Sequence, residues 1–89
     1  MQKKNDPIIN IGNNLQLLLN HYSFSLRELS KAINVTHSHL SKVKRKVANP
    51  SIGLTKKIAD FFKISIAQLI GEQAIDFEKL PKKTDRNSK

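Results

Sequence analysis

Two helix-capping residues that stand eleven positions apart constrain the fold of this 89-residue chain more than any other feature. Ser25 is followed three residues later by Glu28, the pattern of a capping box, in which side chains satisfy backbone donors at a helix start. Thr36 is also a preferred N-cap, and Asn34 just before it suits the left-handed conformation that ends many helices. The pattern predicts a short helix, a tight turn and a second helix that begins after Thr36.

Apolar residues recur at helical spacing on both sides of this unit and predict three more helices. The first covers about residues 10–21, the fourth follows the chain break at Pro50, and the fifth follows the cap Ser65. Their apolar stripes are Ile11, Leu15 and Leu18 in the first helix, Leu54, Ile58 and Phe62 in the fourth, and Ile66, Leu69 and Ile70 in the fifth. No alternation typical of strands occurs, so the sequence predicts an all-α fold, a compact bundle of five short helices.

Polar ends frame the predicted bundle and divide the chain into three segments. Residues 1–8 carry too few apolar side chains to offset the entropy of ordering, so we expect a flexible N-terminal segment. Residues 9–71 are expected to form the folded domain, with the capped two-helix unit at about residues 25–45. Residues 72–89 are expected to form a partly disordered C-terminal extension.

The charge balance points to a polyanionic partner. Sixteen Lys and Arg residues stand against seven Asp and Glu, which gives a formal net charge of +9 and a pI near 10.1. Such a field attracts nucleic acid over distance, and double-stranded DNA is the partner that we expect. A membrane surface would also attract the charge, but the apolar helix faces are needed for the core, so we expect no membrane partner.

The sequence lacks the residue patterns typical of catalytic and metal-binding sites. The chain has no cysteine, which excludes disulfides, thiolate zinc sites and a cysteine nucleophile. His37 and His39 are two residues apart, so on a helix they point about 200° apart and do not hold one ion together. Paired carboxylates, a Ser, His and Asp arrangement and a glycine-rich phosphate loop are not found. We therefore expect no enzyme activity, no metal and no cofactor.

Three stretches of the chain together resemble a known family of DNA-binding domains. They are IGNNLQLLL, FSLRELSKAINVTHSHLSKVKRKVANPS and LTKKIADFFKISIAQLI, in this order, over residues 10 to about 70. They look like successive segments of the Cro and repressor type helix-turn-helix domain, the XRE family of transcriptional regulators. The resemblance implies a lambda-repressor-like fold whose recognition helix enters the major groove. The sequence departs from the family pattern at Leu26, usually a polar residue, and at Lys44 and Lys46, where Glu and Gly are frequent.

The resemblance also implies which side chains contact DNA, and the chemistry of these residues agrees. The start of a recognition helix lies deepest in the groove, where hydroxyl and imidazole groups reach base edges. Cations and amides hold phosphates and fix the register. The expected base contacts are His37, Ser38, His39, Ser41 and Lys42. The expected phosphate contacts are Thr36, Lys42, Lys44, Arg45, Lys46 and Asn49.

Two apolar sets are candidate contact surfaces for a dimer mate or a protein partner. In the superfamily that the chain resembles, the last helix commonly supplies dimer contacts. In the first helix, periodicity places several apolar residues outside the core stripe, where an apolar cluster often marks an interface. The first set is Ile66, Leu69, Ile70 and Phe77, and the second set is Leu17, Leu19 and Tyr22.

Together these features predict a sequence-specific transcriptional regulator, in particular a repressor, that binds a palindromic operator as a homodimer. We expect it in the cytoplasm, at the nucleoid, as a prokaryotic or phage protein. The alternative is an antitoxin-like or other partner-binding protein whose helix-turn-helix autoregulates its operon.

Overall fold

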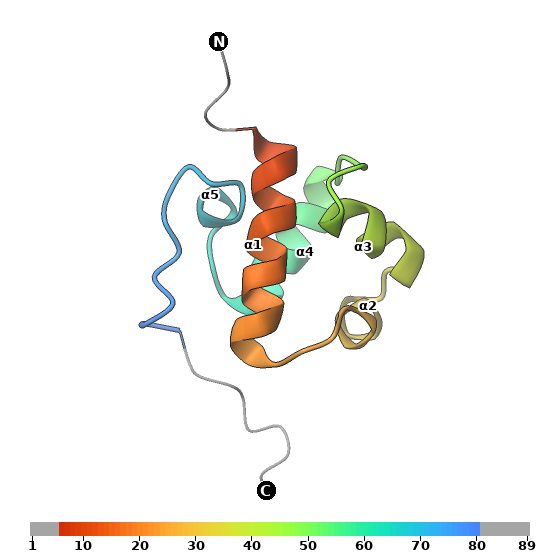
Figure 1. The fold of residues 1–89 in the computed structure, drawn as a ribbon, viewed down its shortest axis with the longest axis horizontal. Coiled ribbons are helices and arrows are strands. Elements are labelled where there is room, and N and C mark those ends of the chain that lie inside the picture. Colours follow the sequence, from red (N-terminus) through yellow and green to blue (C-terminus); the bar gives the residue numbers. More distant parts are fainter. Residues whose placement is uncertain (1–5, 81–89) are drawn as a thin grey trace, which may run out of the picture.

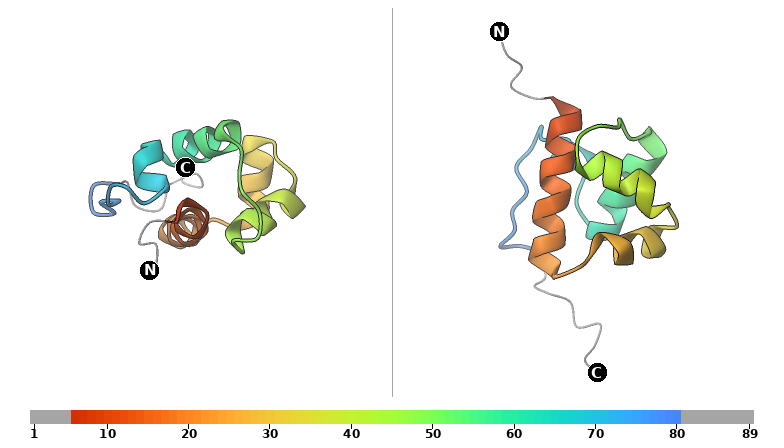
Figure 2. Two further views of the ribbon diagram at one scale, coloured as in Figure 1. Left: turned by 90° about the horizontal axis from the view of Figure 1, so that it is seen from above. Right: turned by 45° about the vertical axis from the view of Figure 1, so that its right-hand side comes forward.

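Five helices follow one another in the computed structural model, which describes residues 6–80. They are α1 (Pro7–Tyr22), α2 (Leu26–Ile33), α3 (His37–Lys44), α4 (Ile52–Phe62) and α5 (Ile66–Leu69). α1 runs through the middle of the molecule, with α2 and α3 on one side and α5 on the other (Figure 1 and Figure 2). No strand forms within residues 6–80, and the prediction of an all-α, five-helix fold is confirmed.

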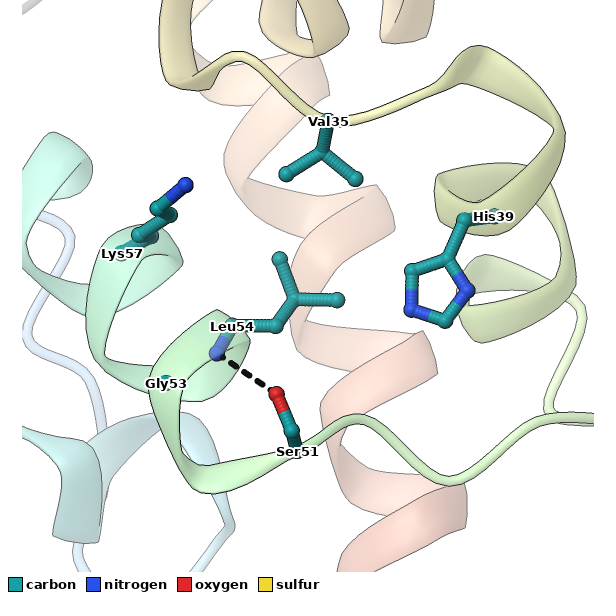
Figure 3. Close-up of a pocket in the computed structure, with 6 residues that line it drawn as sticks. All are labelled: Val35, His39, Ser51, Gly53, Leu54 and Lys57. Atoms are coloured by element: carbon teal, nitrogen blue, oxygen red, sulfur yellow. Dashed lines mark hydrogen bonds between the residues drawn. The ribbon is translucent and has the colours of Figure 1, made fainter.

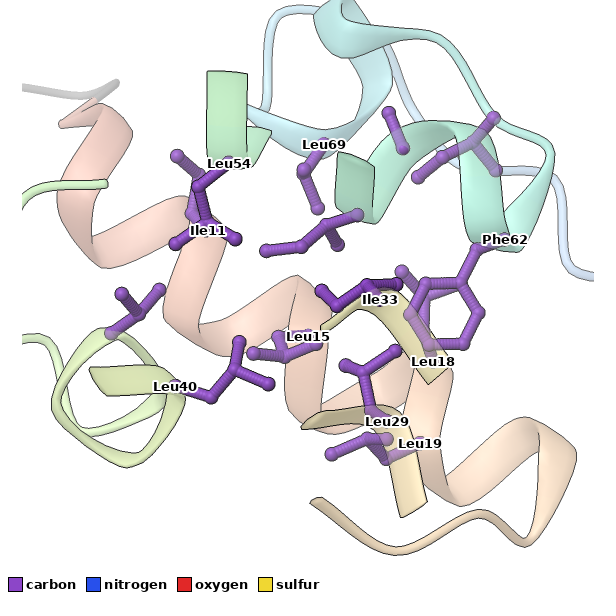
Figure 4. Close-up of a cluster of buried hydrophobic side chains, with 14 of the residues drawn as sticks. Ile11, Leu15, Leu18, Leu19, Leu29, Ile33, Leu40, Leu54, Phe62 and Leu69 are labelled. Carbon is purple, nitrogen blue, oxygen red and sulfur yellow. The ribbon is translucent and has the colours of Figure 1, made fainter. Parts of the chain in front are cut away.

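A cluster of buried apolar side chains joins the five helices. It centres on α1, whose Leu15 and Leu18 are completely buried (Figure 4). The completely buried residues of the other helices are Leu29 in α2, Leu40 and Val43 in α3, Ile58 in α4 and Leu69 in α5. Truncating one such side chain to alanine typically costs about 2 to 5 kcal/mol. The core therefore fixes how α3 is held against α1.

α1 begins earlier than its apolar stripe predicts. Pro7 occupies the first helical position, where its missing N–H is no loss and its φ angle already suits a helix. The Asp6 carboxylate accepts from the Ile8 N–H at 3.1 Å and caps the helix. Residues 7 and 8, which the sequence analysis assigned to the flexible segment, are therefore helical. The rest of that segment, residues 1–5, lies outside the described range.

Two asparagine amides of α1 hold α5 in place. The Asn14 amide donates to the carbonyls of Leu69, at 2.9 Å, and of Gln68, at 3.2 Å. The Asn10 amide donates to the Ile70 carbonyl at 3.0 Å. Carbonyls at a helix end largely lack intrahelical partners, and a helix of four residues consists almost entirely of ends. The two amides therefore supply the hydrogen bonds that α5 cannot make within itself.

The ends of α1 to α4 use left-handed residues that are not glycine, whereas Gly71 (90°) follows α5. Within residues 6–80, the four non-glycine residues with positive φ are Ser23 (54°), Asn34 (60°), Lys46 (69°) and Lys63 (59°). The left-handed conformation costs a residue with a Cβ roughly 1 to 2 kcal/mol, and asparagine tolerates it best. The two lysines therefore carry strain that glycine would relieve.

The buried face of α1 is wider than its stripe, which corrects one predicted contact surface. Leu19 and Tyr22 are 4% and 9% exposed and belong to the core, so the expectation that they lie outside it is wrong. The Tyr22 ring stacks on Phe62 of α4 at 5.6 Å between centroids, and burial raises the pKa of its phenol. α4 thus covers the C-terminal end of α1. Leu17 stays 49% exposed but stands apart from these two buried neighbours.

The chain after α5 returns along α1 as an irregular segment, residues 72–80, which we call the strap (Figure 1). Three of its side chains, Ile75, Phe77 and Leu80, are half-buried against the core. The Phe77 ring lies 5.3 Å from the ring of His21, in the last turn of α1. The strap therefore packs on its own domain, while residues 81–89 of the predicted extension lie outside the described range.

The predicted dimer set of the last helix and the extension does not share one surface. Leu69 is completely buried because it points from α5 into the core, so it is wrong as a contact residue. Phe77 lies at the far end of α1 from α5, since it packs on His21. Ile66 is 39% exposed and Ile70 is half-buried, and these two remain accessible to a partner.

Candidate nucleic-acid interface

The turn between α2 and α3 is closed by hydrogen bonds at both of its ends. Asn34 is left-handed, and the Val35 N–H donates to the Ser30 carbonyl at 3.0 Å, as in a Schellman motif. The Thr36 hydroxyl accepts from the His39 N–H at 3.1 Å and caps α3. The predicted turn and cap are confirmed. They fix the direction in which α3 leaves α2.

α3 has a buried side and a solvent side. Leu40 and Val43 are completely buried and hold the helix on the core. At about 100° of rotation per residue, Ser38, Lys42 and Arg45 point away from these two residues. All three are exposed. We call them the outward row, and they present a hydroxyl, an ammonium and a guanidinium to whatever lies along α3.

The two histidines of α3, His37 and His39, lie on opposite flanks of the helix and not in the outward row. His39 points toward the start of α4 and lines a hollow of about 340 Å³ together with Val35, Ser51 and Lys57, among others (Figure 3). His37 is exposed on the opposite flank. The sequence analysis placed both imidazoles in one group of base contacts, and the structure separates them.

Two of the predicted phosphate-binding cations have partners within the domain. The Lys44 ammonium donates to the side-chain oxygen of Gln16 on α1 at 2.8 Å, which draws it toward α1. The Arg45 Nε donates to the Ser41 hydroxyl at 3.4 Å, which lays the guanidinium along α3. Ser41 itself is half-buried, whereas Lys42 is exposed. Arg45 and Lys42 are therefore the better placed of the predicted cations on α3.

The remaining predicted phosphate contacts lie at the two ends of α3. Thr36 is exposed at its start, with its hydroxyl engaged as the cap. Lys46 is exposed just after its end. Asn49 is exposed in the loop that leads to α4, where it lines a groove together with residues of α1 and α5. Asn49 thus faces a different part of the molecule from the outward row.

α1 and the end of α3 approach each other closely at Gly12, a contact that the sequence analysis did not predict. A Cβ atom at this position would lie 2.7 Å from the Lys46 Cγ and 2.9 Å from the Lys44 carbonyl oxygen. The Lys46 stem therefore lies across α1. Glycine destabilises the interior of a helix. Its presence at position 12 therefore indicated a place where another part of the chain packs closely on α1.

Lys57 of α4 is a second residue that the sequence analysis missed. Its ammonium donates to the Ile33 carbonyl, at the end of α2, at 3.2 Å. A cation at a helix C-terminus is favourable because the carbonyls there carry partial negative charge. The contact ties α4 to the turn that precedes α3. No local pattern points to it, since the two residues are 24 positions apart.

Charge is distributed unevenly over the two sides of α1. Between Glu28 and Asp60 the sequence contains seven Lys and Arg residues and no acid, and α3 lies within this stretch. The strap lies on the opposite side of α1 (Figure 1 and Figure 2). Its acidic residues are Glu72, Asp76 and Glu78. Within residues 6–80, the longest stretch of positive charge without an acid therefore lies on the side of α3.

Comparison with known proteins decides the family. The family model described as helix-turn-helix, of the XRE type, matches residues 15–69, more than half of the chain. The chain belongs to this helix-turn-helix family. Membership supports a DNA-binding transcriptional regulator. No match is found among curated protein sequences.

Solved structures similar to this helix-turn-helix protein include three transcription regulators. The SOS-response transcriptional repressor LexA from Eubacterium rectale aligns with a TM-score of 0.70 at 20% identity, over 93% of this chain and 89% of that one. The hypothetical transcription factor NHTF from Neisseria aligns with 0.68 at 20% identity, over 79% and 85%. The clp gene regulator ClgR from C. glutamicum aligns with 0.65 at 23% identity, over 80% and 97%. These similarities show a shared fold.

Two further observations concern membranes and metals. Among the helices of residues 6–80, none is long and apolar enough to cross a membrane. The same residues contain no group of three or more His, Cys, Asp or Glu side chains able to hold a metal ion.

Proposed function

We propose that this helix-turn-helix protein is a sequence-specific transcriptional repressor that binds a palindromic operator as a homodimer. The observation that carries the proposal is the outward row of α3, Ser38, Lys42 and Arg45, which stands opposite the buried Leu40 and Val43. A helix held in this way presents its solvent side to the major groove, and its first turn reaches deepest. The protein acts in the cytoplasm of a prokaryotic cell, at the nucleoid.

Base reading is assigned to the first turn and the middle of α3. Ser38 is central because it is exposed and its hydroxyl can donate to or accept from any base edge. Lys42 follows one turn later and reaches guanine acceptors or a phosphate. His37 and His39 contact the bases or sugars on either side of the row. Ser41 contributes less, since it is half-buried and already accepts from Arg45.

Phosphate binding is assigned to the cations at and beyond the C-terminal end of α3. Arg45 and Lys46 extend beyond the end of α3, and Lys44 reaches the backbone from the edge near α1. Thr36 offers the start of α3, where backbone N–H groups favour an anion. These contacts position the protein without reading sequence, and each neutralised phosphate releases counterions. Affinity is therefore expected to fall steeply with salt.

The dimer is proposed because a single recognition helix is short. One short helix contacts only a few base pairs, so a two-fold pair with recognition helices about 34 Å apart doubles the sequence that is read. Such a pair requires an operator with inverted repeats, because the symmetry of the protein is matched by that of the site.

Selection from a random duplex library with purified protein, at near-physiological salt, tests the proposal. An inverted repeat with half-sites one helical turn apart is the expected result. Retention of DNA without a motif would contradict sequence reading. No retention at all would contradict DNA binding by the chain alone and favour a role in binding a protein partner.

A further inference from the structure

One side of α1 carries the side chains that end α3. Gly12, Gln16 and Asn20 are spaced by four residues, so they lie one above the other on the same side of the helix. We call these three residues the α1 stripe. Two lysines from the end of α3 lie on it, Lys46 across Gly12 and Lys44 at Gln16. The α1 stripe therefore supports two of the cations that are assigned to phosphates.

Two hydrogen bonds in series fix the Lys44 ammonium on the α1 stripe. The ammonium donates to the Gln16 side-chain oxygen at 2.8 Å, and the Gln16 amide nitrogen donates to the Asn20 side-chain oxygen at 3.1 Å. The second bond orients the Gln16 amide, because an amide whose nitrogen faces Asn20 turns its oxygen the other way, toward Lys44. An ammonium has three N–H donors, so two remain for another acceptor. Lys44 is thus held in place while it can still bind an anion.

The α1 stripe also leaves the charge of Lys44 intact. Residues 7–22 contain no Asp or Glu, so α1 offers the lysine amides and no carboxylate. A carboxylate at position 16 would form a charge-assisted bond with the ammonium and would compete with a phosphate for it. An amide oxygen accepts the same hydrogen bond and neutralises nothing. A neutral acceptor therefore suits a cation that is held in the free protein and used in a complex.

We propose that Gln16 is a positioning residue for DNA binding, whose amide, oriented by Asn20, holds the Lys44 ammonium in place for a phosphate at the edge of α3 nearest α1. The inference rests on the proposed function, which assigns Lys44 to the DNA backbone. A long side chain that is already held in the free protein loses less conformational freedom on binding, which is worth about two- to tenfold in affinity. α1 thereby takes part in DNA binding without a Lys or Arg of its own.

The salt dependence of binding to random-sequence duplex DNA, followed by fluorescence anisotropy, tests the inference. Gln16→Glu keeps the size of the side chain and adds a carboxylate that pairs with Lys44. The slope of log K against log salt is expected to become shallower by about 0.9, the value of one phosphate contact, and affinity at near-physiological salt to fall about fivefold. Circular dichroism checks that the variant is folded. A merely structural role of Gln16 would leave the slope unchanged.

Gln16→Met separates the two effects of the amide. It removes the acceptor of the hydrogen bond but leaves the charge of Lys44 free. Affinity is therefore expected to fall about two- to tenfold, with the slope unchanged. An affinity equal to that of the wild type would show that the hydrogen bond does not prepare Lys44 for DNA, and would overturn the inference.

Leu17→Glu is the matched control for added charge. Leu17 is exposed and lies about 100° further round α1 than Gln16, so a carboxylate there points away from the α1 stripe. It is expected to change the slope by less than half as much as Gln16→Glu does. In a Lys44→Met background Gln16→Glu should act no more strongly than Leu17→Glu, because the ammonium with which it would pair is gone.

Lys44→Met alone separates this inference from the proposed function. It is expected to make the slope shallower by about 0.9, as the loss of one phosphate contact requires. If it does so while Gln16→Glu acts no more strongly than Leu17→Glu, the positioning role of Gln16 fails and the phosphate contact of Lys44 stands. An unchanged slope in Lys44→Met would contradict that contact, which belongs to the proposed function, and the inference with it.

Discussion

The two segments that pack on opposite sides of α1, α3 and the strap, use the same kind of anchor and opposite charges. α3 places Leu40 and Val43 in the core, and the strap places Ile75, Phe77 and Leu80 against it. Residues 37–46 contain four cations and no acid, whereas the strap contains three acids and one lysine. The comparison teaches that burial attaches a segment to the domain, while the residues left in solvent decide what the attached segment does.

The largest expected difference between the two segments is in stability. Leu40→Ala is expected to lower the free energy of unfolding by about 2 to 5 kcal/mol, because it removes a completely buried side chain and leaves a cavity. Phe77→Ala is expected to cost only about 1 kcal/mol, since Phe77 is half-buried. Urea unfolding followed by circular dichroism measures both values. Equal losses would show that the strap is as much a part of the core as α3.

Charge reversal sharpens the comparison. Lys42→Glu is expected to lower the affinity for any duplex DNA on the order of tenfold, because it places an anion where a phosphate is bound. Glu78→Lys on the strap is expected to change affinity by less than about threefold, since charges farther away than the Debye length of about 10 Å are screened at 0.1 M salt. Fluorescence anisotropy with random-sequence DNA measures both. A larger gain from Glu78→Lys than loss from Lys42→Glu would place the DNA on the strap side.

The cap of α3 is expected to have a smaller effect on stability. Thr36→Ala removes the acceptor of the His39 N–H and should cost about 1 kcal/mol. Thr36→Ser keeps the hydroxyl and is the matched control. Unfolding curves of the two variants distinguish the cap from the methyl group. If serine were as destabilising as alanine, the hydroxyl would not be the stabilising group.

Glycine at the two left-handed lysines is expected to have the smallest effect, and a favourable one. Lys46→Gly and Lys63→Gly should each stabilise the fold by about 0.5 to 1 kcal/mol, because glycine adopts a positive φ without a Cβ penalty. Only Lys46→Gly is expected to weaken DNA binding as well, since Lys63 lies at the end of α4, outside α3 and the loop that follows it. Thermal unfolding and anisotropy titrations report the two effects. Equal DNA affinities for both variants would remove Lys46 from the phosphate contacts.

Features that depend on neighbouring residues were predictable from the sequence. The capping box at Ser25, the cap at Ser65 and the left-handed Asn34 are present as expected. Each is made by groups three to five residues apart, so the residue types alone determine the geometry. The all-α fold followed because the apolar stripes and these caps agree.

Features that depend on distant residues were not predictable. Leu19 and Tyr22 are buried in the shared core, where Tyr22 stacks on Phe62 of α4, and no pattern within α1 reveals these distant neighbours. Leu69 was assigned to an interface from the resemblance, yet it points into the core because Asn14 holds α5 against α1. The hydrogen bond from Lys44 to Gln16 spans 28 positions. It separates Lys44 from the outward row, which the string of cations in the sequence does not show.

The central claim is that α3 reads bases with Ser38, in its first turn, and holds phosphates with Arg45 and the other cations near its end. The most direct test measures the affinities of Ser38→Ala and Arg45→Ala for the selected operator and for random DNA at one salt concentration. Ser38→Ala should lose about 1 to 3 kcal/mol on the operator and nothing on random DNA, while Arg45→Ala should lose equally on both. Equal losses on operator and random DNA for both variants would contradict the claim.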